Sequence, residues 1–303
     1  MPYSTYIEEF RLWLQEENKD PKTIQAYLTA VRQFITWYGR RTGRLYILQI
    51  QPLDIKDYLN YQENHLLRSP NTINKSIAAL RTYFIFLSNA GYIVDNPMIR
   101  IKSRQINYDC QCKGINKWLT KKEQQQFIHT LATEPNDFER VRNLAIIDLM
   151  LYSGLRVSEV VNLKLEDVDG SDHLQITVGR KGNKSAQTVF LLEKHNHNLL
   201  QWLKLRQQLS KLEHLNSPHL FVSARNGQLS ARGIQVMVDK YARLAGIRQL
   251  NCQRFRHSYC KNLADTGASI NTIAGLARHA NLNSTRIYLN DSQLEMIQAL
   301  EKI

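Results

Sequence analysis

A histidine and a tyrosine lie nine residues apart near the end of the chain, in the polar stretch LARHANLNSTRIYLN (residues 276–290). His279 offers ring nitrogens that can bind an anion, and Tyr288 offers a phenolic oxygen that can act as a nucleophile. A half-packed tyrosine near a solvated histidine explains the same stretch without any chemistry, because both residue types are common at intermediate burial. The stretch alone favours this simpler explanation.

Arginines recur in two further stretches with apolar neighbours. SGLRVSEV places Arg156 two residues after Gly154, at a predicted helix start, with Glu159 one turn later. NCQRFRHSYC places Arg256 and His257 at the start of another predicted helix. Each stretch alone is more typical of a surface ion pair or a solvated charge. Two arginines that converge could instead fork onto the oxygens of a phosphate.

A third basic stretch, GRKGNK, carries Arg180, Lys181 and Lys184 at the tip of a predicted hairpin. A lysine ammonium is a mobile proton donor as well as a charge. The three stretches together therefore favour one anion site over three separate surface charges.

The signatures of several other enzyme classes are missing from the sequence. It holds no Walker A loop, dinucleotide fingerprint, HExxH or GxSxG motif. Glu166, Asp167 and Asp169 lie close together, but acidic residues are ordinary in a turn, and a metal site of oxygen ligands needs several convergent carboxylates. We therefore expect neither a metal nor a cofactor.

Composition indicates a polyanionic partner. Lys and Arg outnumber Asp and Glu by 40 to 27, which gives a net charge of +13. Such an excess favours nucleic acid, because binding releases the counterions condensed on phosphates, although a merely soluble basic protein would have the same charge. The chain has no membrane-length apolar run and no signal peptide, and its four cysteines lack zinc-finger spacing. We expect a cytoplasmic, nucleoid-associated protein with reduced thiols.

The first hundred residues predict four amphipathic helices, which would form a small bundle. The two clearest begin at Asp20-Pro21 and Ser69-Pro70, where a capping residue precedes a proline at the first helical position, and Gly91 ends the second. Residues 101–117 are basic and have neither a helix nor a strand period. They are predicted to link domain 1–100 to domain 118–303.

The second domain predicts a mixed fold. Thr120 and Glu123 form a capping box, and an apolar helix is predicted over residues 138–152. Residues 174–178 and 188–192 alternate as two strands on either side of the GRKGNKS turn. Helices follow, including an amphipathic tail helix after Tyr288. The predicted fold class is therefore α+β, mainly α, with a small antiparallel sheet.

The four basic stretches, taken in order, resemble the tyrosine recombinases of the phage-integrase family, and especially the Xer-like recombinases and transposon-encoded resolvases. SGLRVSE resembles the first-arginine box, VGRKGNKSAQTVFL the hairpin lysine box, QRFRHSYC the His-x-x-Arg-His box, and LARHANLNSTRIY the box that ends in the nucleophile. LFVSARNGQLSARGI is similar to the family's Leu-Phe-x-Ser segment. The likeness covers the second domain almost end to end, and the first domain resembles the helical core-binding domain.

The resemblance implies a role for each matching residue. Tyr288 would attack the scissile phosphate and remain linked to it as a 3′-phosphotyrosine. Arg156 and Arg256 would bind the non-bridging oxygens, and Lys181 would protonate the leaving 5′-hydroxyl. His279 would hydrogen-bond the phosphate. Glu159 would support the pocket. Four further residues would contact DNA: Arg180, Lys184, Lys75 and Arg81.

One box departs from the family pattern. The family commonly has His, sometimes Lys, three residues before the second arginine, where this chain has Gln253. A glutamine amide can donate a hydrogen bond but carries no charge and cannot relay a proton. We expect a contact between Gln253 and the phosphate without acid–base chemistry.

The resemblance implies an enzyme that recombines DNA through a Holliday junction without metal or ATP. It would act as a homotetramer on two inverted-repeat core sites, with accessory DNA sites or proteins as further partners. The first predicted helix begins close to Met1, so we expect no arm-binding domain, which favours resolution or excision. The alternatives are a phage or mobile-element integrase, a type IB topoisomerase-like enzyme, and a non-catalytic DNA-binding regulator.

Overall fold

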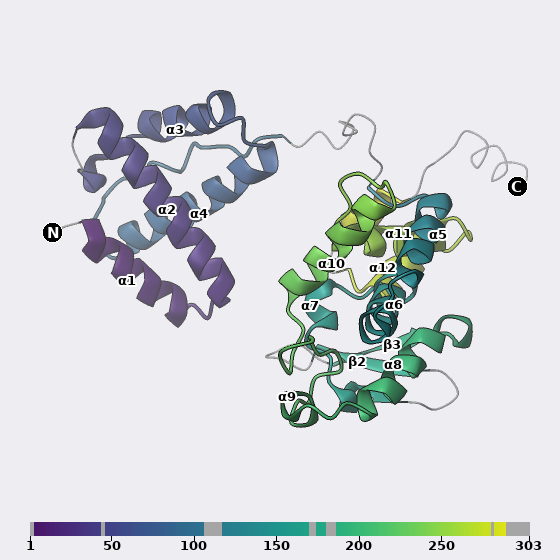
Figure 1. The fold of residues 1–303 in the computed structure, drawn as a ribbon. Coiled ribbons are helices and arrows are strands. Elements are labelled where there is room, and N and C mark those ends of the chain that lie inside the picture. Colours follow the sequence, from purple (N-terminus) through teal and green to yellow (C-terminus); the bar gives the residue numbers. More distant parts are fainter. Residues whose placement is uncertain are drawn as a thin grey trace, which may run out of the picture. The chain divides into compact units, whose positions relative to one another are not determined.

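The computed structural model describes residues 3–43, 46–105, 117–169, 174–179, 186–279 and 282–288. The chain divides into two compact units, unit 1 (Met1–Gln111) and unit 2 (Cys112–Ile303). Figure 1 shows that unit 1 is helical and that unit 2 combines helices with a small sheet. The α+β, mainly α fold class predicted above is confirmed.

Unit 1 is a helical bundle in which α2 and α4 pack along each other, with α1 and α3 against both (Figure 1). The predicted caps are present: the Asp20 carboxylate accepts a hydrogen bond from the Lys22 backbone N–H, and the Ser69 hydroxyl accepts one from that of Thr72. The elements of this unit are α1 (Tyr3–Glu16), α2 (Pro21–Thr42), the 3₁₀ turn η1 (Ile47–Gln49), α3 (Pro52–Asn64) and α4 (Pro70–Asn89).

The packing of unit 1 continues into the first residues of the predicted linker. Ile101 is buried, and its carbonyl oxygen accepts a hydrogen bond from Arg81 Nη2 at 2.8 Å. The Asn74 side chain pairs with both backbone groups of Arg104, at 2.7 and 2.9 Å. Residues 101–105 therefore belong to the packed surface of unit 1, and the rest of the predicted linker up to residue 116 lies outside the described residues.

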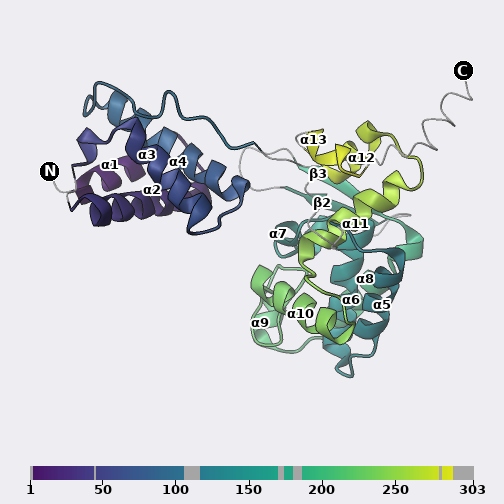
Figure 2. The same cartoon turned by 90° about the horizontal axis from the view of Figure 1, so that it is seen from above.

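Unit 2 is built around α6, an almost wholly buried helix that contacts α5, α7, α8 and α11 (Figure 2). The capping box predicted at Thr120 and Glu123 is present at the start of the first helix of this unit, since the two residues bond each other's backbone N–H. The helices are α5 (Lys121–Ala132), α6 (Asp137–Tyr152), α7 (Val157–Val160), α8 (His197–Gln207), α9 (Leu212–Leu215), α10 (Ala231–Leu244), α11 (Cys252–Ala264), α12 (Ile270–Ala277) and α13 (Asn283–Arg286), with 3₁₀ turns η2 (Leu165–Asp167) and η3 (Glu193–His195).

A small antiparallel sheet lies in the described part of unit 2, with strand order β1-β2-β3. Its strands are β1 (Val168–Asp169), β2 (Leu174–Val178) and β3 (Gln187–Leu191), and β3 begins one residue earlier than predicted. Leu174, Ile176 and Val178 point into the core, as the alternation requires. Val178 pairs with Gln187, so the connection that contains Lys181 leaves the sheet at that end.

Candidate active site

Arg256 lies on α11 and is 4% exposed. Its two terminal nitrogens donate to the carbonyl oxygens of Gly154, just before α7, and Ala277, the last residue of α12. Burial, with the nearby charges of Arg156 and Arg278, lowers the pKa of the Arg256 guanidinium to about 10. The group remains a cation at neutral pH and ties together two segments that are far apart in the sequence.

Gly154 determines how the chain enters α7. It has φ +64°, a left-handed conformation that glycine adopts without strain. A Cβ at this position would lie 2.4 Å from the ring of Tyr259 on α11. The backbone therefore approaches α11 closely at a point that only glycine permits, and Arg156 follows two residues later.

Glu159 lies between two arginines. Its carboxylate accepts hydrogen bonds from the Arg156 backbone N–H at 2.7 Å and from Arg156 Nη1 at 2.9 Å. It also forms an ion pair with Arg278 Nη2 at 2.8 Å. Burial tends to raise the pKa of Glu159, but the Arg156 N–H and the Arg278 and Arg156 charges lower it overall. The carboxylate is therefore ionised and holds Arg156, whose side chain is 44% exposed, at the edge of the site.

His279 follows the end of α12 and comes close to the arginines. Its Nδ1 pairs with the Thr285 hydroxyl at 2.7 Å. Burial and then the charges of Arg256, Arg156 and Arg278 lower its pKa to about 4, so the ring is neutral at pH 7. If the Thr285 hydroxyl donates to Nδ1, the ring proton lies on Nε2, which can then donate to a phosphate.

Tyr288 is buried, with 1% of its surface exposed, although the surrounding sequence is polar. Its hydroxyl contacts His257 Nδ1 and lies close to the Cys260 thiol. Burial and the neighbouring Cys260 raise the pKa of the phenol well above its usual value. The phenol is therefore neutral and shielded in this conformation.

Two partners of Tyr288, His257 and Cys260, were not assigned a role from the sequence. They lie three residues apart on one face of α11, a spacing that brings both side chains to the same neighbour. Burial, followed by the positive charges around it, lowers the pKa of His257 to about 4. Cys260 is a buried free thiol, as is Cys252.

Gln253 lies in the first turn of α11, two residues beyond the capping residue Asn251. Its side chain is exposed and forms no hydrogen bond to any described residue, while its backbone N–H donates to Asn251 Oδ1 at 3.0 Å. The adjacent Arg254 has a structural role instead, since its guanidinium donates to the carbonyl oxygens of Arg248 and Trp118. The described contacts leave the Gln253 amide available to a ligand.

The expected hairpin residues Arg180, Lys181 and Lys184 lie outside the described residues, as does the predicted tail helix. Of the DNA contacts expected in unit 1, Lys75 is exposed. Arg81 is half-buried and holds the Ile101 carbonyl, so one of its nitrogens is already used.

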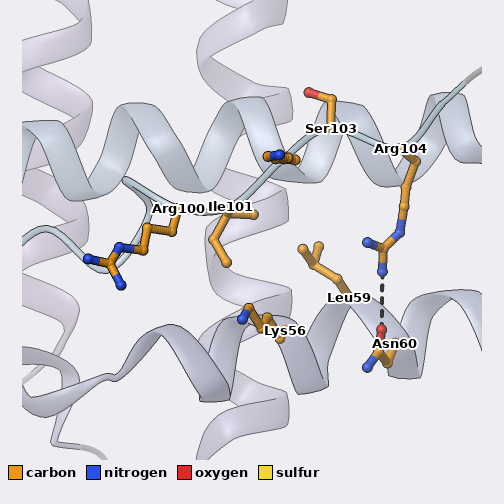
Figure 3. A pocket seen from close by; sticks show the side chains of 8 residues that line it. Lys56, Leu59, Asn60, Arg100, Ile101, Ser103 and Arg104 are labelled. Carbon is orange, nitrogen blue, oxygen red and sulfur yellow. Dashed lines mark hydrogen bonds between the residues drawn. The ribbon is translucent and has the colours of Figure 1, made fainter.

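Unit 1 also has a basic pocket of about 310 Å³ between α3 and the segment after α4, shown in Figure 3. The side chains of Ile101 and Leu59 lie between the two elements, and Arg104 reaches down to α3. Arg104 donates to Asn60 at 3.1 Å and to Glu63 at 3.0 Å. These bonds hold the Arg104 side chain against α3, on one side of the pocket. The polar lining includes four cationic side chains, Lys56, Arg100, Lys102 and Arg104.

Three of these four side chains are available to bind an anion. Lys56, Arg100 and Lys102 are exposed and have no ion pair with a described residue.

Within the described ranges no group of three or more His, Cys, Asp or Glu could hold a metal ion. The same residues include no helix that is long and apolar enough to cross a membrane.

Comparisons with known proteins agree in sequence and in fold. Residues 117–295 match the Phage integrase family, and residues 6–87 match the N-terminal SAM-like domain of phage integrases. The TnP I resolvase of Bacillus thuringiensis is 26% identical, with 97% of this chain and 98% of the resolvase covered. The tyrosine recombinase XerA of Pyrococcus horikoshii is 28% identical, with 99% and 93% covered.

Solved structures show the same fold. An integrase of the transposon Tn1549, in complex with a circular intermediate DNA, superposes with a TM-score of 0.76 at 15% identity, with 98% of each chain covered. The XerH recombinase bound to its difH substrate gives a TM-score of 0.72 at 20% identity, with 91% of this chain and 78% of XerH covered. Since the family match alone spans more than half of the chain, this protein belongs to the phage integrase family and is a tyrosine recombinase.

Proposed function

We propose that this chain is a site-specific recombinase that cleaves and rejoins DNA through a 3′-phosphotyrosine link at Tyr288 and a Holliday junction. Resolution or excision of a DNA segment would be its task. The observation that carries the proposal is the convergence of Arg156 and Arg256 on the backbone just before His279, where they donate to the carbonyl oxygens of Arg278 and Ala277, in the unit that also holds Tyr288. The names of the resolvase and Xer relatives support the choice of reaction.

In the proposed reaction the Tyr288 oxygen forms a bond to phosphorus, and the bond from phosphorus to the 5′ oxygen breaks. Arg156 and Arg256 neutralise the charge that develops on the non-bridging oxygens, a role that needs no metal. Lys181 gives its proton to the departing 5′ oxygen. The new phosphotyrosine ester keeps the energy of the old ester, so rejoining needs no ATP.

The phenol must leave its buried position before it can attack. Two interactions hold it there: the burial of the ring and the contacts of the hydroxyl with His257 and Cys260. Full exposure of such a ring costs about 2–3 kcal/mol, and loss of one neutral hydrogen bond costs about 1 kcal/mol. We infer that DNA binding supplies this free energy, so that the protein without DNA is held inactive.

The phenolic proton also needs an acceptor. The rings of His257 and His279 lie 5.7 and 6.5 Å from the Tyr288 ring between centroids, and both are neutral at pH 7. His279 Nδ1 is already paired with Thr285. The His257 ring is the one that can take the proton, because its Nδ1 contacts the Tyr288 hydroxyl. This matters because Gln253, which occupies the place of the usual histidine, cannot. We propose that Gln253 gives the phosphate one neutral hydrogen bond.

The DNA contacts extend to unit 1 in this proposal. Backbone phosphates of the duplex would bind the exposed cations of the basic pocket and Lys75, and in unit 2 they would bind Arg180 and Lys184. Each such contact releases counterions and makes binding sensitive to salt. A homotetramer on two inverted-repeat sites would assemble the recombining complex, in a protein that works in the cytoplasm on the nucleoid.

The test separates this function from its alternatives. The target site is first selected from a pool of random duplexes by the full chain, and two direct copies are placed on a supercoiled plasmid. We expect two smaller circles from this plasmid and none from a control with one copy scrambled. Relaxed plasmid without any dependence on the site would identify a topoisomerase-like enzyme. Binding without cleavage would identify a DNA-binding regulator.

A further inference from the structure

Arg278 adopts a backbone conformation that an arginine rarely adopts. It ends α12 in the left-handed region, with φ +54° and ψ +49°. This conformation is costly for a residue with a Cβ and costs glycine nothing. An arginine that persists at such a position is a candidate for a functional role of the side chain, because strain tends to be kept where it serves function.

The guanidinium of Arg278 is buried but only partly satisfied. Its side chain is 7% exposed, and Nη2 pairs with Glu159. Nε and Nη1 are buried and have no hydrogen-bond partner in the described part of the chain. Buried donors are nearly always paired, so two unpaired nitrogens on one cation indicate a ligand that this form of the protein does not hold.

The surroundings of Arg278 indicate the charge of that ligand. Its carbonyl oxygen accepts a hydrogen bond from Arg156 Nη2 at 3.4 Å, and Ala277 beside it accepts one from Arg256. Three guanidinium groups therefore lie close together, and the one described carboxylate among them, Glu159, pairs with Arg156 and Arg278. The excess of positive charge suits an oxyanion.

We propose that Arg278 is a third phosphate-binding arginine, which contacts a non-bridging oxygen of the scissile phosphodiester together with Arg156 and Arg256. The inference rests on the proposed function and extends it, because the recombinase boxes assign no role to this position. The competing explanation is a positioning role, in which Arg278 only holds Glu159 and thereby Arg156.

Two variants and a matched control test the contact. Arg278→Gly removes the side chain and keeps a residue suited to the backbone, and Arg278→Lys keeps the charge without the fork. Gln249→Gly is the control, because Gln249 is exposed and also has a positive φ of +51°. Single-turnover cleavage of a nicked duplex should slow about 10²-fold in Arg278→Gly, less in Arg278→Lys, and stay at the wild-type rate in the control.

A second substrate separates a direct contact from a positioning role. Each non-bridging oxygen of the scissile phosphate is replaced in turn by a neutral methyl group, and wild type and Arg278→Gly are compared on both isomers. A direct contact predicts that the defect shrinks at least tenfold on one isomer, because the charge that Arg278 neutralises is gone. An equal defect on the natural and both modified substrates would overturn the inference in favour of positioning.

Thermal unfolding without DNA gives an independent measure. We expect the midpoint of Arg278→Gly to stay near that of wild type, since loss of the strained residue and of two unpaired donors offsets loss of the ion pair with Glu159. A lower midpoint with wild-type cleavage would also overturn the inference, because Arg278 would then serve the fold alone. Failure of the wild-type protein to cleave its selected site would refute the proposed function instead.

Discussion

Gln253 offers a clean test of how the phosphate is held. Its side chain is exposed and unbonded to the described residues, so Gln253→Ala should change the free energy of unfolding by no more than about 0.5 kcal/mol. In the proposed site the amide gives the phosphate one neutral hydrogen bond, worth about 1 kcal/mol, which corresponds to about a fivefold slower cleavage. Arg256→Ala removes a buried cation and should slow cleavage at least 10²-fold.

Single-turnover cleavage of a nicked duplex, which prevents religation, measures these rates. Gln253→His, which restores the residue usual in the family, should remain active, and thermal unfolding should give midpoints near wild type for both Gln253 variants. Wild-type cleavage in Gln253→Ala combined with an inactive Gln253→His would refute the reasoning. The glutamine would then serve packing only, and the assignment of this box would be wrong.

Three further predictions concern metal, pH and DNA affinity. Cleavage should proceed at the wild-type rate in excess EDTA with matched monovalent salt, and a rate restored only by magnesium would contradict this. Burial lowers the pKa of His257 and His279 to about 4, so the unfolded chain binds more protons between pH 6.5 and 4, and urea midpoints should fall as pH drops through this window, less so in His279→Gln. Lys102→Ala should make the slope of log affinity against log salt shallower by about 0.9, whereas Lys19→Ala, an exposed control outside the pocket, should leave it unchanged.

Local signals in the sequence predict most of the fold. The caps at Asp20, Ser69 and Thr120 mark helix starts because each side chain satisfies a backbone N–H within three residues of itself. The alternation over residues 174–178 identifies β2 because one face is buried. The two-residue strand β1 was missed, since two residues cannot show a period, and it exists only by pairing with Ile176 and Gln175.

The site could be predicted only in part. The residue types around Arg156 and Arg256 indicate an anion site, but their convergence depends on Arg256 bonding Gly154 and Ala277, which are 123 residues apart in sequence. The burial of Tyr288 could not be predicted from its polar neighbours, because much of its cover comes from α11, α12 and Trp118, which are distant in the sequence. Likewise, no local pattern reveals that Arg278 has a buried guanidinium.

The central claim is that Tyr288 becomes covalently joined to DNA, and trapping that link tests it most directly. A labelled nicked duplex carrying the selected site is incubated with the full chain, and the denatured complex is digested and mapped by mass spectrometry. We predict a phosphotyrosine adduct on the peptide that contains Tyr288, and none with Tyr288→Phe, which should still bind the duplex with wild-type affinity. A covalent complex that persists in Tyr288→Phe, or an adduct mapped to another residue such as Tyr259, would contradict the account.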